Sequence, residues 1–239
     1  MEPERGEATA LSTRRTGAVL LADRDGGPDS PGSWAFARAG TMTLLELCAG
    51  ALERCDDIEA FVVVVAPGLE DRVAGTLGGS SKFLAAVSGG STRRRSVMAG
   101  VEALPAHFDA VLWHDAARPL ASPELFAAVL GALEDADAVV PGVPVGDTLK
   151  RVEAGMVRAT VPRSGLWAMQ TPQGFRRRAR LRAAGAEGRE ADDAWPLGAA
   201  GVRVVTLAGE HSNIRVSSAG DLRLVESLLA HRQASEHGR

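Results

Sequence analysis

Residues 108–119 read FDAVLWHDAARP, an apolar run that ends in a polar turn. The apolar part predicts a buried strand, and His114 to Pro119 then place an acid, two small side chains and a guanidinium at its carboxyl end. In open α/β sheets this edge is where ligands bind. An Asp there can bind a ribose hydroxyl or a metal ion, and an Arg is suited to a phosphate. Taken alone, the hexapeptide can equally be a polar turn without a ligand.

The segments on both sides of this stretch alternate between short apolar runs and helix-like spacing. Residues 61–65 read FVVVV without alternation, which is typical of a strand covered on both faces. Strands are expected at 17–22, 61–65, 83–87, 109–113, 138–143 and 202–207, and helices at 41–54, 68–77, 92–104, 122–134, 175–184, 192–197 and 219–231. Strands that alternate with helices of this length predict an α/β fold with a mostly parallel, doubly wound sheet.

The pattern changes between Gly146 and Arg163. Residues 147–152 and 156–161 alternate apolar and polar side chains around the turn Glu153-Ala154-Gly155, which predicts a β-hairpin. The hairpin is polar enough to project from the main sheet as an arm. Such an arm is often a dimerisation device, so we expect a homodimer joined through residues 146–163.

Composition limits the class of protein. The chain has 239 residues, 45% apolar and 24% charged, with a formal net charge of −3. Because there is no overall basic field, nucleic acid is not an expected partner. The sequence shows no secretory signal or long apolar span, which predicts a cytoplasmic protein with no membrane partner. We expect one domain at 16–231, with flexible tails at 1–15 and 232–239.

Four further segments carry chemistry. Gly89 and Gly90 open a predicted helix, where free amides with a Ser and nearby Arg side chains can hold a base, a ribose or a phosphate, or can simply cap the helix. The other three segments place hydroxyl and cationic side chains near strand ends. In one-letter code the four are GGSTRRRS (89–96), GDTLK (146–150), TVPRSGLWAMQTPQ (160–173) and SNIRV (212–216).

In this order and spacing, the segments resemble the 2-C-methyl-D-erythritol 4-phosphate cytidylyltransferases of the non-mevalonate isoprenoid pathway. The resemblance covers roughly residues 17–230. It implies a Rossmann-like nucleotidyltransferase fold, an arm-clasped homodimer, and the joining of a sugar-alcohol phosphate to CTP with Mg²⁺. It predicts no dedicated metal-binding side chains, because the ion would be held mainly by the nucleotide phosphates.

The resemblance also implies roles for individual residues. Arg215 stands where the family has a Lys that stabilises charge at the reacting α-phosphate, and Asp115 helps to place the nucleotide; these two are the expected catalytic residues. The remaining expected contacts fall into two groups. The nucleotide-binding residues are Ala22, Gly26, Gly89, Gly90, Ser96, Asp115 and Ala116. The acceptor-binding residues are Arg118, Thr148, Arg163 and Thr171, with Thr148 and Arg163 supplied by the partner subunit around the acceptor phosphate.

One segment departs from the family pattern. The family's PAAGxGxR loop, which wraps the triphosphate, aligns with Leu21 to Pro28, where Asp23 and Asp25 add negative charge. No Lys precedes Lys82, and Trp34 aligns with a catalytic Lys of the family, so Arg24 or Arg38 would have to substitute in space. Two alternatives therefore stay open. One is a paralogue that keeps the fold and dimer as a binding or regulatory protein, and the other is a transferase for a different polyol phosphate.

Overall fold

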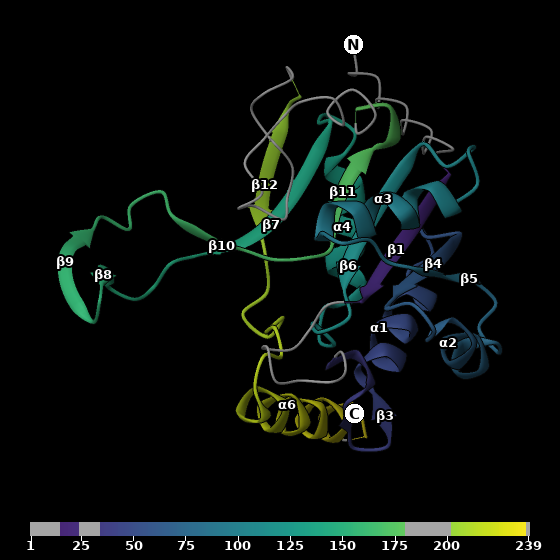
Figure 1. The fold of residues 1–239 in the computed structure, drawn as a ribbon, viewed down its shortest axis with the longest axis horizontal. Helices are drawn as coiled ribbons and strands as arrows, with labels where there is room; N and C mark the ends of the chain where they lie inside the picture. Colours follow the sequence, from purple (N-terminus) through teal and green to yellow (C-terminus); the bar gives the residue numbers. More distant parts are fainter. Residues whose placement is uncertain (1–14, 24–33, 180–201, 238–239) are drawn as a thin grey trace, which may run out of the picture.

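A computed structural model describes residues 15–23, 34–179 and 202–237. Within them lies an eight-stranded sheet in the order β10-β7-β11-β6-β1-β4-β5, with β12 paired to β7 (Figure 1). Strands β5, β4, β1 and β6 are parallel, β11 lies antiparallel between β6 and β7, and β12 is parallel to β7. The strands are β1 (Thr16–Ala22), β4 (Ala60–Val65), β5 (Phe83–Ser88), β6 (Ala110–Asp115), β7 (Ala138–Pro144), β10 (Trp167–Met169), β11 (Gln173–Arg176) and β12 (Val204–Ala208). The expected α/β fold with a mostly parallel sheet is confirmed.

Helices cover both faces of the sheet. Along β1, Ala18, Leu20 and Ala22 pack with α1, α2 and α4, whereas Val19 and Leu21 pack with α3 on the opposite face. Burial on both faces explains why these strands read as continuous apolar runs. The helices are α1 (Leu44–Glu53), α2 (Glu70–Leu77), α3 (Arg93–Ala103), α4 (Pro123–Ala132) and α6 (Ala219–His237), with a short 3₁₀ helix η1 (Trp34–Phe36) and a small hairpin of β2 (Arg38–Ala39) and β3 (Met42–Thr43).

Hydroxyl side chains begin three of these helices. Thr43, Ser122 and Thr92 are the N-caps of α1, α4 and α3, and each side chain accepts a backbone N–H of the first turn. Thr43 and Glu46 form a full capping box. The cap of α3 fixes the start of this helix directly after Gly89 and Gly90, which places these glycines at the carboxyl edge of the sheet.

The connections create a switch point at this edge. Strand β1 pairs with β4 on one side and with β6 on the other, so the chain runs from β1 through β4 to β5 and then returns to the other side of β1 as β6. Leu21 lies opposite Asp115, and Val65 lies opposite Ser88, so the ends of β1, β4, β5 and β6 meet. A switch point of this kind leaves a crevice outside the strand ends.

The expected hairpin is present as β8 (Leu149–Glu153) and β9 (Met156–Val161), and it projects from the body of the molecule (Figure 1). Its turn contains Ala154 and Gly155 at positive φ. Val152, Met156 and Val157 are 54%, 54% and 63% exposed. Adjacent exposed apolar side chains of this kind mark a surface that another chain can cover.

Several expected boundaries differ from the structure. A helix was expected from Phe175, but residues 173–176 form β11, because Phe175 is fully buried beside Val111 on β6 and a Cβ at Gly174 would lie 2.8 Å from Val129. The helix begins only at Arg177. Strand β6 also continues through His114 and Asp115, and α6 continues beyond His231 to His237.

The extension of α6 reaches into the expected C-terminal tail at 232–239, of which residues 232–237 are helical. Arg232 donates to the Leu120 carbonyl at 3.1 Å and to Ser212 Oγ at 3.2 Å, which ties this part of the helix to the body. The helix expected at 192–197 lies outside the described residues. The division into a domain at 16–231 and an N-terminal tail at 1–15 stays a prediction.

Two adjacent arginines at the end of β11 bind the carboxyl ends of helices on opposite faces of the sheet. Arg176 donates to the carbonyls of Leu133, Glu134 and Ala136 beyond α4. Arg177 donates to three carbonyls at the end of α3, those of Val101, Leu104 and Pro105, at 2.9, 3.2 and 2.6 Å. These bonds satisfy carbonyls that have no partner inside the helix.

Replacing Arg177 by Met is expected to lower the free energy of unfolding by roughly 2 kcal/mol, because Met keeps the apolar stem but leaves the carbonyls of α3 without their charged donor. Urea denaturation measures this loss. Arg178, which is exposed, provides the matched control as Arg178→Met. Equal losses in the two variants would show that the capping contacts contribute nothing.

Candidate active site

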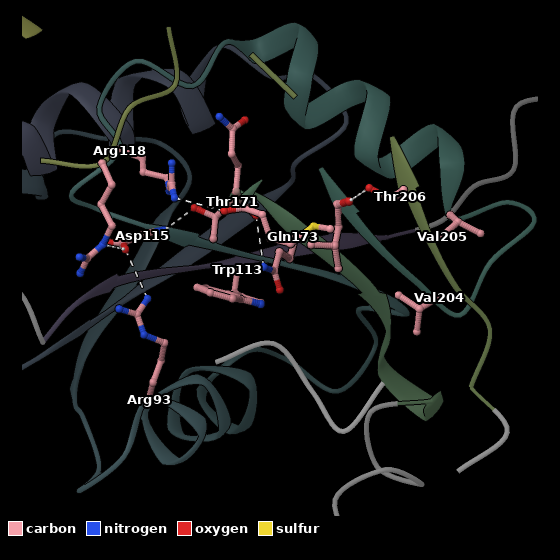
Figure 2. A pocket seen from close by; sticks show the side chains of 13 residues that line it. Arg93, Trp113, Asp115, Arg118, Thr171, Gln173, Val204, Val205 and Thr206 are labelled. Carbon is pink, nitrogen blue, oxygen red and sulfur yellow. Dashed lines mark hydrogen bonds and ion pairs between the residues drawn. The ribbon is translucent and has the colours of Figure 1, made fainter. Parts of the chain in front are cut away.

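A pocket of about 580 Å³ begins at the crevice of the switch point, beside Asp115, and extends along the sheet towards β7 and β12 (Figure 2). This volume lies in the range of small-molecule and cofactor sites. Charged and polar side chains line one part, and the apolar side chains of β7 and β12 line the other. The lining residues are Arg93, Trp113, Asp115, Arg118, Val140, Met169, Gln170, Thr171, Gln173, Val204, Val205, Thr206 and Arg215.

Asp115 is the centre of the charged part. Its side chain is 3% exposed, and its Oδ2 accepts from Arg215 Nε at 3.0 Å and from Arg93 Nη1 at 3.3 Å. Its Oδ1 accepts the Ala117 N–H at 3.0 Å, which fixes the turn that follows β6. Burial alone would raise the pKa of Asp115, but the two guanidinium groups outweigh burial and lower this pKa, so the carboxylate stays charged.

The pocket carries excess positive charge. Among the described residues that line it are three arginines, Arg93, Arg118 and Arg215, and one carboxylate, that of Asp115. Arg93 also lies over the Trp113 ring at 5.9 Å from the ring centroid. Guanidinium groups bind phosphate oxygens with paired donors. The arrangement therefore suits a phosphorylated ligand.

Arg118 and Thr171 are held by a buried polar network. Arg118 Nη1 donates to the Asn213 carbonyl at 2.7 Å, and Asn213 Nδ2 donates to the Thr171 carbonyl at 2.8 Å. Thr171 Oγ1 accepts the Asp115 N–H at 3.0 Å and lies 3.0 Å from His114 Nδ1. The network joins the β6 turn, residues 170–173 and residues 213–215, so segments far apart in sequence share one rigid wall.

Those expected nucleotide-binding residues that the structure describes form a second group at the same edge. Ala22 ends β1, and Ala116 N donates to the Leu21 carbonyl at 2.8 Å. Gly90 N donates to Ser96 Oγ at 3.0 Å at the start of α3, next to the pocket residue Arg93. The structure therefore brings these residues to the crevice, and their role in binding a nucleotide stays a prediction.

Asp23 enters this second group. Its carboxylate accepts a hydrogen bond from the buried hydroxyl of Ser96. A Cβ at Gly89 would lie only 2.5 Å from Asp23 Oδ2, so the carboxylate fits here because Gly89 has no side chain. A fixed negative charge thus lies among the residues expected to bind the nucleotide.

The region aligned with the family's catalytic Lys is apolar where it is described. Trp34 packs in a cluster with Ala39, Leu44, Val216 and Val225, between α1 and α6. Arg38 donates to the Thr41 carbonyl in the β2–β3 hairpin. The positions Arg24, Asp25 and Gly26 lie outside the described residues.

Thr148 and Arg163 lie at the base of the arm and do not line the pocket of their own chain. Both are exposed, and Arg163 donates to the Gly146 carbonyl. Their expected role depends on a partner subunit, so a single chain does not bring them to the other site residues.

Sequence reasoning assigned no role to several lining residues. Arg93 lies in the GGSTRRRS segment, whose basic residues after two glycines indicated a cationic group at the helix start but not its pairing with Asp115. Gln170 and Asn213 lie within quoted segments, but their mutual contacts depend on chain crossings that a sequence does not show. Val204, Val205 and Thr206 form one wall of the pocket, but their sequence predicts only a strand.

The described parts of the chain contain no cluster of three or more His, Cys, Asp or Glu side chains that could hold a metal ion. The one pocket carboxylate, Asp115, is already paired with two arginines. A protein-built metal cage is therefore absent from the described pocket. Among the described helices, none has the length and apolar character to cross a membrane.

A pH dependence follows from His114, which is 1% exposed. Burial lowers the pKa of His114 from 6.5 to about 4, so below pH 6.5 the unfolded chain binds a proton that the folded chain refuses. The contribution of neutral His114 to the free energy of unfolding is full above pH 6.5 and is lost as the pH falls towards 4. We expect the free energy of unfolding to be about 2 kcal/mol lower at pH 5 than at pH 7.

Urea denaturation at the two pH values measures this difference. His114→Gln removes the titrating group and should show a smaller pH dependence, whereas His231→Gln, at an exposed position on α6, should retain it. An unchanged pH dependence in His114→Gln would contradict this assignment.

A doubly wound sheet with a cationic pocket at its switch point defines the class of nucleotide-binding α/β proteins. Residues 31–231 match the family described as "IspD: 2-C-methyl-D-erythritol 4-phosphate cytidylyltransferase". The chain belongs to this family, whose fold is that of the Rossmann-like nucleotidyltransferases.

Individual relatives agree with this assignment. The chain is 43% identical to a bifunctional enzyme IspD/IspF of Clavibacter michiganensis subsp. michiganensis, across 90% of this chain but only 55% of that protein. It is 39% identical to the 2-C-methyl-D-erythritol 4-phosphate cytidylyltransferase of Frankia casuarinae, across 94% of this chain and 85% of that one. The crystal structure of the cytidylyltransferase from Thermus thermophilus matches with a TM-score of 0.71 and 33% identity, covering 89% of this chain and 98% of that one.

Proposed function

We propose that this protein transfers a cytidylyl group from CTP to 2-C-methyl-D-erythritol 4-phosphate, as a cytoplasmic homodimer. The observation that carries the proposal is the triad of Arg93, Asp115 and Arg215 at the switch point of a family member. An oxygen of the acceptor phosphate attacks the α-phosphorus of CTP, and the bond from this phosphorus to the bridging oxygen breaks. Pyrophosphate leaves, and no general base is needed because the attacking oxygen is already ionised.

The pocket residues divide between the two substrates. Asp115 places the nucleotide together with Ala22, Ala116 and the Gly89–Ser96 segment, while Arg215 stabilises the charge that develops on the α-phosphate. Arg118 and Thr171 serve the acceptor side, with Thr148 and Arg163 of the partner subunit. Catalysis of phosphoryl-type transfer is mainly positioning and charge neutralisation, and the guanidinium groups supply both.

A divalent cation, Mg²⁺, fits this proposal as an ion held mainly by phosphate oxygens of CTP. Mg²⁺ commonly binds through substrate phosphates and few protein carboxylates, and the pocket offers only Asp115. When bound, the ion neutralises part of the charge on the triphosphate. Orientation of the α-phosphate remains the task of Arg215.

The proposal predicts that the purified protein binds CTP in the presence of Mg²⁺. Calorimetric titration tests it, first with CTP alone and then with the sugar-alcohol phosphate present. Micromolar CTP binding supports the proposal. Absence of binding to a cooperatively folded protein would leave the second candidate, a binding or regulatory dimer, which the position of Asp23 favours. Binding of CTP without transfer to this acceptor would favour another polyol phosphate.

Asp23→Ala is expected to tighten CTP binding by about tenfold, because it removes a negative charge next to the nucleotide site and frees the Ser96 hydroxyl for the ligand. Asp71→Ala on α2 changes the net charge equally at an exposed position and is the matched control. Weaker CTP binding in Asp23→Ala would show instead that the carboxylate contributes to recognition of the nucleotide.

A further inference from the structure

His114 lies at the end of β6, buried behind the pocket, with a partner at each ring nitrogen. Nε2 is 3.0 Å from the Arg118 carbonyl oxygen, and Nδ1 is 3.0 Å from Thr171 Oγ1. The ring packs edge-on against Phe126, with 5.1 Å between centroids. Because burial lowers the pKa of His114 to about 4, the ring is neutral near pH 7 and carries a single N–H.

The partners decide which nitrogen carries this proton. A carbonyl oxygen can only accept, so the contact with Arg118 requires the N–H at Nε2. Nδ1 is then an acceptor, and the Thr171 hydroxyl must donate to it. The same hydroxyl oxygen accepts the Asp115 N–H at 3.0 Å. A hydroxyl has one proton, so Thr171 has none left to donate to a ligand.

We propose that His114 is a positioning residue that fixes the Thr171 hydroxyl as an acceptor towards the pocket, so that this position recognises a hydroxyl group of the polyol and not a phosphate oxygen. An ionised phosphate oxygen would meet a lone pair of Thr171, whereas a hydroxyl can donate to it. Binding of the phosphate is left to Arg118. From the family resemblance, Thr171 was expected to contact the acceptor phosphate. In the proposed arrangement it contacts a hydroxyl group of the polyol instead.

Through hydrogen bonds, His114 also helps to fix the backbone of two pocket residues besides Thr171. Its Nε2–H holds the Arg118 backbone, and the Thr171 hydroxyl holds the Asp115 backbone. The chain of hydrogen bonds thus runs from the Asp115 N–H through Thr171 and His114 to the Arg118 carbonyl. Reversal of any one bond would require a second proton on the ring or the loss of a contact.

The identity of the polyol rests on the proposed function. The donor and acceptor roles of His114 and Thr171 do not. Long-range ¹H–¹⁵N correlation spectra of the full chain report the tautomer of each His, and His114→Gln assigns the signal. We expect protonation at Nε2 only, unchanged from pH 8 to pH 5. A ring protonated at Nδ1, or a doubly protonated ring at pH 6, would overturn the inference whether or not the protein transfers cytidylyl groups.

A second experiment separates a hydroxyl contact from a phosphate contact. Thr171→Val keeps the shape but removes the hydroxyl, and Thr171→Ser restores it. We expect Thr171→Val to weaken binding of the sugar-alcohol phosphate at least about tenfold, with affinity for inorganic phosphate changed less than about twofold and with rescue by Ser. Calorimetry with each probe gives these affinities without requiring turnover.

The opposite pattern would overturn the proposal. If Thr171→Val weakened binding of inorganic phosphate as much as that of the sugar-alcohol phosphate, the Thr171 hydroxyl would be a hydrogen-bond donor to the phosphate. It would have no ligand role if neither affinity changed. In turnover assays the same variant should raise KM for the acceptor more than KM for CTP, and equal increases in both would indicate a general loss of structure.

Discussion

Replacing Arg215 by Ala is expected to lower kcat/KM for CTP by about 10²–10³-fold, equivalent to roughly 3–4 kcal/mol of transition-state stabilisation. Arg215 is the pocket cation that the family pattern places at the reacting α-phosphate, and its Nε is held 3.0 Å from Asp115 Oδ2. This contact aims the guanidinium before the substrate arrives. Its loss therefore removes both charge and preorganisation.

Initial rates of pyrophosphate release, measured over a range of CTP concentrations, give this value. Arg223→Ala on the exposed side of α6 removes the same type of side chain and should leave kcat/KM unchanged. Arg215→Lys, which introduces the residue found in the family, should recover most of the loss. Unchanged activity in Arg215→Ala would contradict the assigned role of this residue.

Arg163→Ala is expected to reduce activity about 100-fold or more, although Arg163 does not line the pocket of its own chain. In the proposed dimer, Arg163 of the partner subunit contacts the acceptor phosphate. The half-exposed apolar side chains of Val152, Met156 and Val157 on the arm are consistent with a surface that a partner covers.

A mixture of Arg163→Ala and Arg215→Ala chains provides the sharper test. After subunit exchange, half of the dimers are mixed, and one of the two sites in each mixed dimer combines an intact pocket with an intact arm. We therefore expect recovery of about a quarter of the wild-type activity from two inactive proteins. Recovery would not occur if each chain used its own arm or if the protein were a monomer.

Much of the fold could be predicted from sequence because local chemistry and tertiary packing agree. The continuous apolar run 61–65 became a strand buried on both faces, and Thr43, Thr92 and Ser122 became helix caps. The helix expected from Phe175 was wrong because residues 173–176 form a long-range antiparallel pairing with β6. Gly174 and Phe175 fill space against distant residues, which local helix-like spacing does not reveal.

The candidate site was predictable where one short segment carries its own chemistry. Asp115, Ala116 and Arg118 follow one strand, and their position at the sheet edge follows from the doubly wound pattern. The pairing of Arg93 and Arg215 with one carboxylate oxygen depends on three elements meeting, so it could not be predicted from spacing. The contact between Asp23 and Ser96 likewise joins residues far apart in sequence.

The most direct test of the account is formation of the cytidine diphosphate product from CTP, Mg²⁺ and 2-C-methyl-D-erythritol 4-phosphate, followed by ³¹P NMR with the purified full-length chain. If the protein has this activity, signals of the diphosphate product and of pyrophosphate grow together in equal amounts, and neither grows without the acceptor. Absence of both signals, from a folded protein at substrate concentrations well above those that saturate binding, would contradict the proposed cytidylyltransferase activity.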